Sequence, residues 1–183
     1  MDSTLKTSRI LGLDPGTQEM GYALLEGDVV VDFGVRTLPY GLMVHDLLLE
    51  AEAVLDELLA RYRPDLFVIE HTFYIKTRRG AILRIMVSEL KRLARDRGVR
   101  VVSYMPTAVK KAVAGHGHAS KGEVAATLTR RWPALERYRA GGEERNQTHW
   151  QHMFDALALA LTANTRRHLI FKVDEHTNST TSS

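Results

Sequence analysis

The chain has 183 residues, with 25 basic and 22 acidic side chains and a formal net charge of +3. This length suits one domain with one well-buried core. The absence of cysteine excludes a disulfide scaffold, a cysteine-ligated zinc site and a cysteine nucleophile. No apolar run is long enough to span a membrane and no signal peptide is recognisable, so we expect a cytoplasmic protein without membrane contact.

The charge is distributed unevenly along the chain. Residues 1–75 carry 5 basic and 13 acidic side chains, whereas residues 76–139 carry 16 basic and 4 acidic ones. A cationic segment of this size attracts polyanions, which favours nucleic-acid binding over the alternative of a solvated basic helix face.

The first part of the chain predicts three strands joined as an antiparallel meander. The runs are rich in branched and aromatic residues and cover 9–14, 21–26 and 29–38. Gly27 and Asp28, between the second and third runs, suit a tight hairpin turn. In the segment 14–17 (D-P-G-T), Pro15 and Gly16 occupy the central positions of a type II turn.

The remainder of the chain predicts alternating helices and strands. Apolar periodicity predicts helices over 43–62 and 80–97, and continuous apolar runs predict buried strands over 66–70 and 100–104. Further helix starts are predicted at Pro106, at Ser120 with a capping box, and at Thr148, the last helix continuing to about Arg167.

This order of elements is shared by the ribonuclease-H-like fold, an α/β fold with a five-stranded mixed sheet flanked by helices. We expect this ribonuclease-H-like domain to cover residues 9–170. Residues 1–8 would be an N-terminal extension, and residues 171–183 are polar enough that we expect a disordered tail.

Acidic residues end two of the predicted apolar strands, at Asp14 and Glu70. If the strands are parallel neighbours, both carboxylates lie at the sheet edge where open α/β proteins bind ligands. Carboxylates held close together repel each other unless they are protonated or bridged by a cation, and oxygen ligands favour Mg²⁺ or Mn²⁺. The alternatives are a turn-forming aspartate at Asp14 and an ordinary strand end at Glu70.

The final predicted helix carries His149, His152 and Asp155 on one face. Asp155 interrupts an apolar run, where a buried charge needs a partner; the alternatives are a solvent-facing aspartate and a surface histidine at 152. His149, nearer the predicted helix start, is expected to be an ordinary surface histidine. A pocket with two divalent cations would hydrolyse a phosphodiester and leave a 5′-phosphate and a 3′-hydroxyl.

Four motifs in this order resemble the RuvC family of bacterial Holliday junction resolvases. They are I-L-G-L-D-P-G-T…G-Y-A at 10–23, V-I-E-H-T-F at 68–73, V-K-K-A-V-A-G-H-G-H-A-S-K at 109–121 and F-D-A-L-A-L-A at 154–160. The resemblance extends from about residue 9 to residue 168. It implies a homodimeric endonuclease of recombination and DNA repair that nicks two strands of like polarity across a four-way DNA junction.

The resemblance also implies roles for single residues. Asp14, Glu70, His152 and Asp155 correspond to metal-binding catalytic residues, and His152 stands where most relatives carry a fourth carboxylate. Because imidazole suits Mn²⁺ better than Mg²⁺, we expect Mn²⁺ to be favoured, with two ions per site. A neutral His152 would alternatively orient or deprotonate the attacking water.

The resemblance further implies contacts with DNA and with partner proteins. Phe73 would stack on a base at the junction centre, and Lys76, Lys110 and Lys121 would contact junction phosphates. The helix over 80–97 is apolar on more than one side, which favours either a two-fold dimer interface or a wholly buried core helix. The family's association with a RuvA–RuvB branch-migration complex is a further implied partner.

Three other functions compete with this interpretation. The D-P-G-T segment is also typical of ATPases and sugar kinases of the actin and Hsp70 type, but that class needs two such domains. A non-catalytic nucleic-acid-binding module and a ribonuclease-H-like nuclease with another substrate are the remaining alternatives.

Overall fold

The structure of the chain, a computed structural model, describes residues 8–71, 76–139, 144–167, 169 and 170. Five strands form one sheet in the order β3-β2-β1-β4-β5. The strands are β1 (Arg9–Asp14), β2 (Glu19–Glu26), β3 (Val29–Thr37), β4 (Leu66–Glu70) and β5 (Arg100–Tyr104). The pairs β1–β2 and β2–β3 are antiparallel, whereas β1–β4 and β4–β5 are parallel. This confirms the predicted five-stranded mixed sheet.

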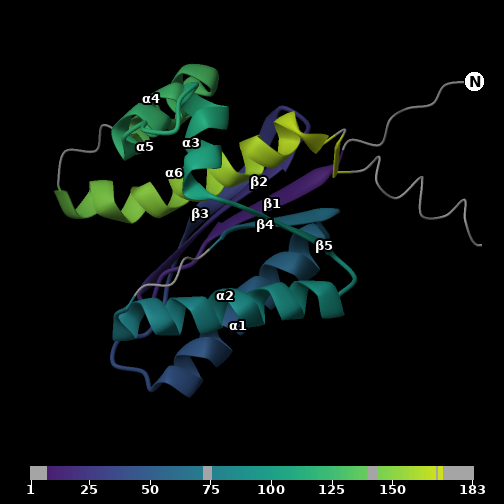
Figure 1. Cartoon of the computed structure of the whole chain (residues 1–183), viewed down its shortest axis with the longest axis vertical. Helices are drawn as coiled ribbons and strands as arrows, with labels where there is room; N and C mark the ends of the chain where they lie inside the picture. Colours follow the sequence, from purple (N-terminus) through teal and green to yellow (C-terminus); the bar gives the residue numbers. More distant parts are fainter. Residues whose placement is uncertain (1–7, 72–75, 140–143, 168, 171–183) are drawn as a thin grey trace, which may run out of the picture.

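Helices cover both faces of the sheet (Figure 1). One face carries α1 (Val44–Tyr62) and α2 (Arg78–Asp96). The other face carries α3 (Pro106–Ala114), α4 (Lys121–Arg131), the short 3₁₀ helix η1 (Pro133–Leu135), α5 (Glu136–Arg139) and α6 (Glu144–Thr165). Within the described part of the chain, no helix has the length and apolar character needed to cross a bilayer.

The alternation of side chains along the strands divides the core into two layers. One layer packs against α1 and α2 and includes Leu11, Leu13, Phe67 and Ile69. The other packs against α6 and includes Ile10, Leu66 and Val68. Because side chains alternate with a period of two, Asp14 and Glu70 lie on the α6 face of the sheet. The strand pattern therefore directs both acids toward the same helix.

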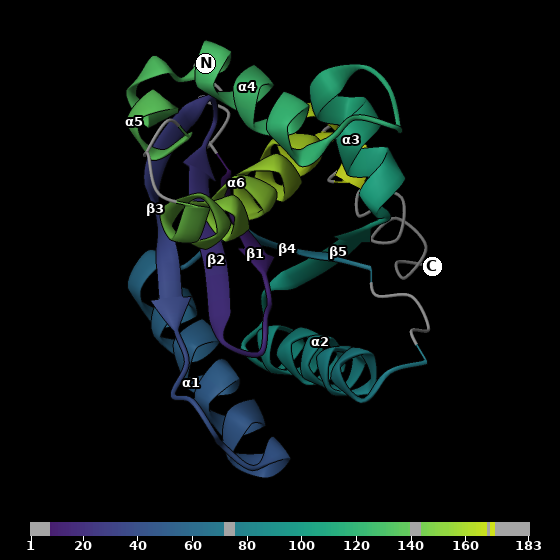
Figure 2. The ribbon, with the colours of Figure 1, turned by 90° about the vertical axis from the view of Figure 1, so that its left-hand side faces the viewer.

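The backbone of α6 approaches the sheet most closely at two glycines. A Cβ atom added at Gly12 would collide with the carbonyl oxygen of Ala156, and one added at Gly21 would collide with the carbonyl oxygen of His152. Figure 2 shows α6 lying across β1 and β2. Glycine in these two strands brings the helix within backbone contact of the sheet and fixes the position of His152 above it.

Several predicted local features are confirmed. Gly27 has a positive φ of 59° in a two-residue hairpin between β2 and β3. Ser120 and Glu123 form the capping box at the start of α4, and Pro106 lies in the first turn of α3. In each case the local sequence favours the observed backbone, and in the hairpin Asp28 also accepts hydrogen bonds from Arg131 and Trp132.

Three local predictions are wrong. The last helix begins at Glu144, so Thr148 lies inside it and is not its cap. The second strand begins at Glu19, two residues earlier than predicted. Gly16 lacks the positive φ that a type II turn requires, and a Cβ there would instead collide with the backbone oxygen of Glu19. The need for a glycine at position 16 therefore comes from its close contact with the backbone of Glu19, and not from the type of turn.

The alternative of a wholly buried α2 is also wrong. The helix buries Met86, Val87 and Leu90 against the sheet layer, but Ile85 on its outward side is 43% exposed. An exposed apolar side chain remains available on the side of α2 that faces away from the core.

We expect Gly12→Ala to lower the free energy of unfolding by about 3 kcal/mol, since the added methyl group must push the α6 backbone away from β1. Urea unfolding followed by circular dichroism measures this loss. Gly122→Ala in α4 is the matched control, because its Cβ would meet only Ser120 Oγ at 3.9 Å. It should raise stability by about 0.5 kcal/mol. Equal stabilities for the two variants would contradict the close approach.

Candidate active site

Asp14 and Glu70 lie side by side at the carboxyl ends of the neighbouring strands β1 and β4. Leu13 pairs with Ile69 in the parallel ladder of β1 and β4, so the next residue of each strand is one of the two acids. The prediction that these strands are parallel neighbours is therefore confirmed. Both carboxylates lie at the carboxyl ends of parallel strands, where open α/β sheets bind their ligands.

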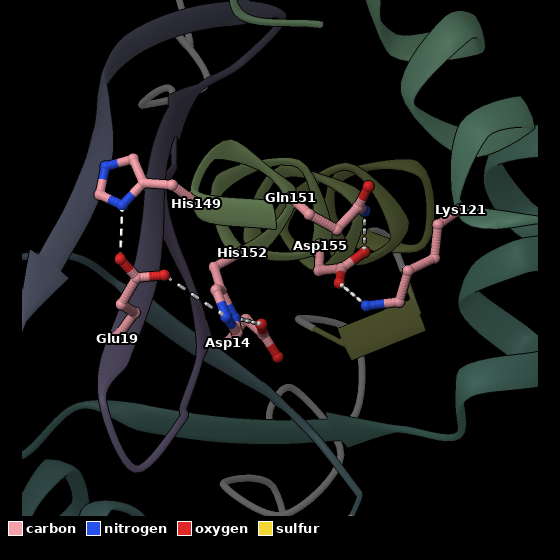
Figure 3. A network of polar contacts seen from close by, with 7 residues as sticks. All are labelled: Asp14, Glu19, Lys121, His149, Gln151, His152 and Asp155. Carbon is pink, nitrogen blue, oxygen red and sulfur yellow. Dashed lines mark hydrogen bonds and ion pairs between the residues drawn. The ribbon is translucent and has the colours of Figure 1, made fainter. Parts of the chain in front are cut away.

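His152 of α6 contacts the first of these acids directly. Its Nδ1 atom lies 2.6 Å from Asp14 Oδ2, and both side chains are mostly buried (Figure 3). The hydrogen bond to Asp14 raises the pKa of His152, although burial partly opposes the shift. An imidazolium paired with a carboxylate at this point offsets part of the negative charge of the sheet edge.

Asp155, one helical turn further along α6, is held by two donors. Gln151 Nε2 donates to Asp155 Oδ1 at 2.8 Å, and Lys121 Nζ of α4 donates to Asp155 Oδ2 at 2.7 Å (Figure 3). Burial raises the pKa of Asp155, and the charge of Asp14 raises it further, whereas Lys121 lowers it. The aspartate in the apolar run thus has the partners that a buried charge requires.

The pKa of Glu70 shows most clearly that these groups share one site. This pKa is raised to about 7, first by burial and then by the charges of Asp14 and Asp155. The charges of Lys121 and Lys110 act in the opposite direction. Three acids and two lysines from β1, β4, α3, α4 and α6 therefore influence one another electrostatically, as a site that binds cations beside an anionic substrate requires.

The remaining predicted site residues have different positions. Lys76 is exposed, immediately before Thr77, whose side chain caps α2. It is not among the charged groups that shift the pKa of Glu70. Phe73 lies outside the described residues.

Three residues at the site were not among the predicted site residues. Glu19 Oε1 lies 2.6 Å from His149 Nδ1, so His149 is a paired residue beside the site and not an ordinary surface histidine. Gln151 supports Asp155. The spacing of His149 and Gln151 relative to His152 and Asp155 on one helix could have predicted the first two. Glu19 could not be predicted in this way, because the predicted strand began two residues too late to include it.

The side chains present suit a divalent metal ion. The donor set consists of three carboxylates and one imidazole, a combination that binds Mg²⁺ or Mn²⁺ through oxygen and tolerates Mn²⁺ at nitrogen. Burial, and after it the charges of Asp14 and Asp155, raises the pKa of Glu70, and a bound cation would favour its charged form. Among the described residues, no three His, Asp or Glu side chains stand close enough together to form a ready-made cage. In this arrangement Lys121 pairs with Asp155 and His152 pairs with Asp14.

Comparison with known proteins assigns the chain to a family. The family model of the crossover junction endodeoxyribonuclease RuvC matches residues 10–163. The chain belongs to the RuvC family. A crossover junction endodeoxyribonuclease RuvC of Synechococcus sp. (strain RCC307) is 34% identical over 163 residues, which cover 85% of this chain and 97% of the relative.

Solved structures agree with this assignment. The RuvC of Thermus thermophilus, solved in complex with a Holliday junction substrate, superimposes with a TM-score of 0.71 and is 26% identical, covering 88% of this chain and 96% of its own. The yeast mitochondrial Holliday junction resolvase has a TM-score of 0.62 at 15% identity, covering 92% of this chain and 84% of its own. This second likeness supports the fold alone, and the two together confirm the ribonuclease-H-like architecture.

We expect Glu70→Gln to become progressively more stable than the wild type as pH rises from 4.5 to 7 in the presence of a chelator. In that interval unfolded Glu70 releases its proton at its ordinary pKa of 4.5, whereas the folded side chain retains it until about pH 7. Folding of the wild type is therefore penalised increasingly as pH rises, and glutamine escapes the penalty.

Urea unfolding midpoints of the two proteins across this interval provide the measurement. Glu50→Gln, an exposed position on α1, serves as the control and should follow the wild type. A constant difference between Glu70→Gln and the wild type at all pH values would show that Glu70 is not shifted.

Proposed function

We propose that this chain resolves four-way DNA junctions as a metal-dependent endonuclease, and that Asp14, Glu70, His152 and Asp155 form its catalytic site. The observation that carries the proposal is the convergence of the three acids at one sheet edge in a chain whose RuvC match spans residues 10–163. Acids placed so close together lower stability unless they serve a bound cation, so their position favours catalysis over a purely structural role.

The chemistry follows from the donor set. Divalent cations bound at the three carboxylates would activate a water for attack on the phosphodiester and stabilise the leaving 3′-oxygen. Asp14 and Glu70 hold fixed positions on β1 and β4, and Asp155 is brought to them by α6. His152 either completes this donor set or accepts the proton of the attacking water. The products would be a 5′-phosphate and a 3′-hydroxyl.

The lysines of α3 and α4 supply a surface for the DNA backbone. Lys110 and Lys121 act on the electrostatics of the acids from one side of the site, and Lys121 is 65% exposed at its side chain. An exposed ammonium group beside the acids is suited to a phosphate next to the scissile bond. Lys76 and Phe73 remain proposed DNA contacts, the first to phosphate and the second to a base.

A homodimer would match the symmetry of the substrate. A four-way junction with two-fold symmetry offers two equivalent strands, so two sites related by a dyad would nick both. The outward side of α2, with Ile85 43% exposed, is the surface we propose for this interface. Within this function, a RuvA–RuvB branch-migration complex is the proposed partner assembly and the cytoplasm the proposed location.

Cleavage of labelled DNA tests the function. We expect metal-dependent nicking of a four-way junction in preference to linear duplex and to an RNA/DNA hybrid. Asp14→Asn should abolish nicking while retaining junction binding in a gel-shift measurement, since it removes a metal-binding charge and leaves the lysines of α3 and α4 in place. Asp46→Asn, at an exposed position on α1, is the matched control and should cleave normally. Preference for the hybrid would instead indicate a different ribonuclease-H-like nuclease, and full activity in Asp14→Asn would exclude the proposed site.

The imidazole at position 152 predicts a metal preference. We expect the wild type to cleave faster with Mn²⁺ than with Mg²⁺, because imidazole binds Mn²⁺ better. His152→Asp should narrow this difference by supplying an oxygen donor. Cleavage rates at saturating concentrations of each metal provide the comparison, and equal rates in both metals, unchanged by His152→Asp, would refute the role of His152 as a ligand.

A further inference from the structure

Glu19 lies between two histidines of α6. Its Oε1 atom is 2.6 Å from His149 Nδ1, and its Oε2 atom is 4.0 Å from His152 Nε2 (Figure 3). Glu19 begins β2, and the alternation of that strand places it in line with Gly21 on the α6 face. The carboxylate is therefore directed at the helix that carries His152.

The imidazole of His152 consequently spans two carboxylates. Nδ1 faces Asp14 at 2.6 Å, and Nε2 faces Glu19. A neutral imidazole carries a proton on one nitrogen and a lone pair on the other. The groups that face the ring determine which nitrogen carries the proton. A lone pair directed at a carboxylate is repelled unless a cation lies between them. The acids that would bind such a cation lie on the side of the imidazole ring that faces Asp14.

Glu19 is held in this orientation from several directions. Its backbone is fixed by the ladder pairing with Thr37 and by the close approach of Gly16. Its side chain is 25% exposed and that of His149 is 31% exposed, so their contact is largely withdrawn from water. Neither constraint on the backbone uses the Glu19 side chain, which can be replaced without disturbing the strand.

We propose that Glu19, anchored by His149, is a positioning residue: when a metal ion replaces the Nδ1 contact with Asp14, Glu19 holds the remaining proton of His152 on Nε2 and leaves the Nδ1 lone pair for the metal. A histidine that binds a metal through one nitrogen commonly donates its other N–H to a carboxylate, which fixes the ring and its tautomer. Glu19 is the carboxylate that faces the second nitrogen. This inference rests on the metal site of the proposed function and adds the group that prepares its nitrogen ligand.

Calorimetric titration of the metal-free protein with Mn²⁺ tests the inference. We expect Glu19→Ala to weaken Mn²⁺ binding about tenfold, and His149→Ala to weaken it less, because Glu19 then loses only its anchor. Glu26→Ala is the matched control. It removes the glutamate at the other end of β2, which pairs with Arg9, and it should leave Mn²⁺ affinity unchanged.

A double-mutant comparison separates positioning from simple loss of negative charge. If Glu19 acts through the ring of His152, Glu19→Ala should have almost no effect on Mn²⁺ affinity in the His152→Asp background. An equal loss in both backgrounds would overturn the proposal, and so would an unchanged affinity in Glu19→Ala alone. Wild-type protein that binds no Mn²⁺ would refute the metal site itself.

A spectroscopic measurement checks the tautomer directly. Long-range ¹H–¹⁵N spectra of the protein loaded with Zn²⁺, a diamagnetic ion that imidazole binds well, should show the His152 proton on Nε2, with the signal assigned by its absence in His152→Asp. In Glu19→Ala the proton should no longer be confined to Nε2. A proton on Nδ1 in the loaded wild type would overturn the proposal.

Discussion

The backbone contact between α6 and the first two strands is the constraint on which the site depends. Gly12 and Gly21 leave no side chain between the sheet and the carbonyl groups of Ala156 and His152. The helix is therefore set at backbone distance, and the side chains of His152 and Asp155 reach the strand ends where the other acids lie. A larger residue in either strand would push the helix away from the sheet and shift His152 and Asp155 relative to the acids of β1 and β4.

The close contact between α6 and the sheet also brings acidic side chains near one another. Burial and the charges of its neighbours raise the pKa of Glu70 to about 7, so the folded chain bears an electrostatic cost at neutral pH. Lys121 and the His152 ring reduce this cost by pairing with Asp155 and Asp14. These partners keep the acids in place, but they occupy oxygens that a metal ion would use. The site is thus organised by charge compensation and not by a preformed cage.

Local patterns in the sequence identified much of the fold and part of the site. Asp14 and Glu70 were found because each ends a short apolar strand, and Asp155 because it interrupts an apolar helix face. The long-range contacts left no such signal. Thr148 has the local features of a cap, yet α6 begins at Glu144, since glutamate, arginine and glutamine among the preceding residues favour helix. Glu19 was missed because its strand is lengthened by pairing with β3, which periodicity alone does not report.

The order of the elements along the chain has a consequence for protein synthesis. All five strands precede α6, so a ribosome releases the entire sheet before the helix that carries His152 and Asp155. Until that helix docks, Asp14 lacks its contact with His152, and a nascent or truncated polypeptide cannot assemble the complete pocket. Under the proposed function, DNA cleavage would begin only after α6 has docked.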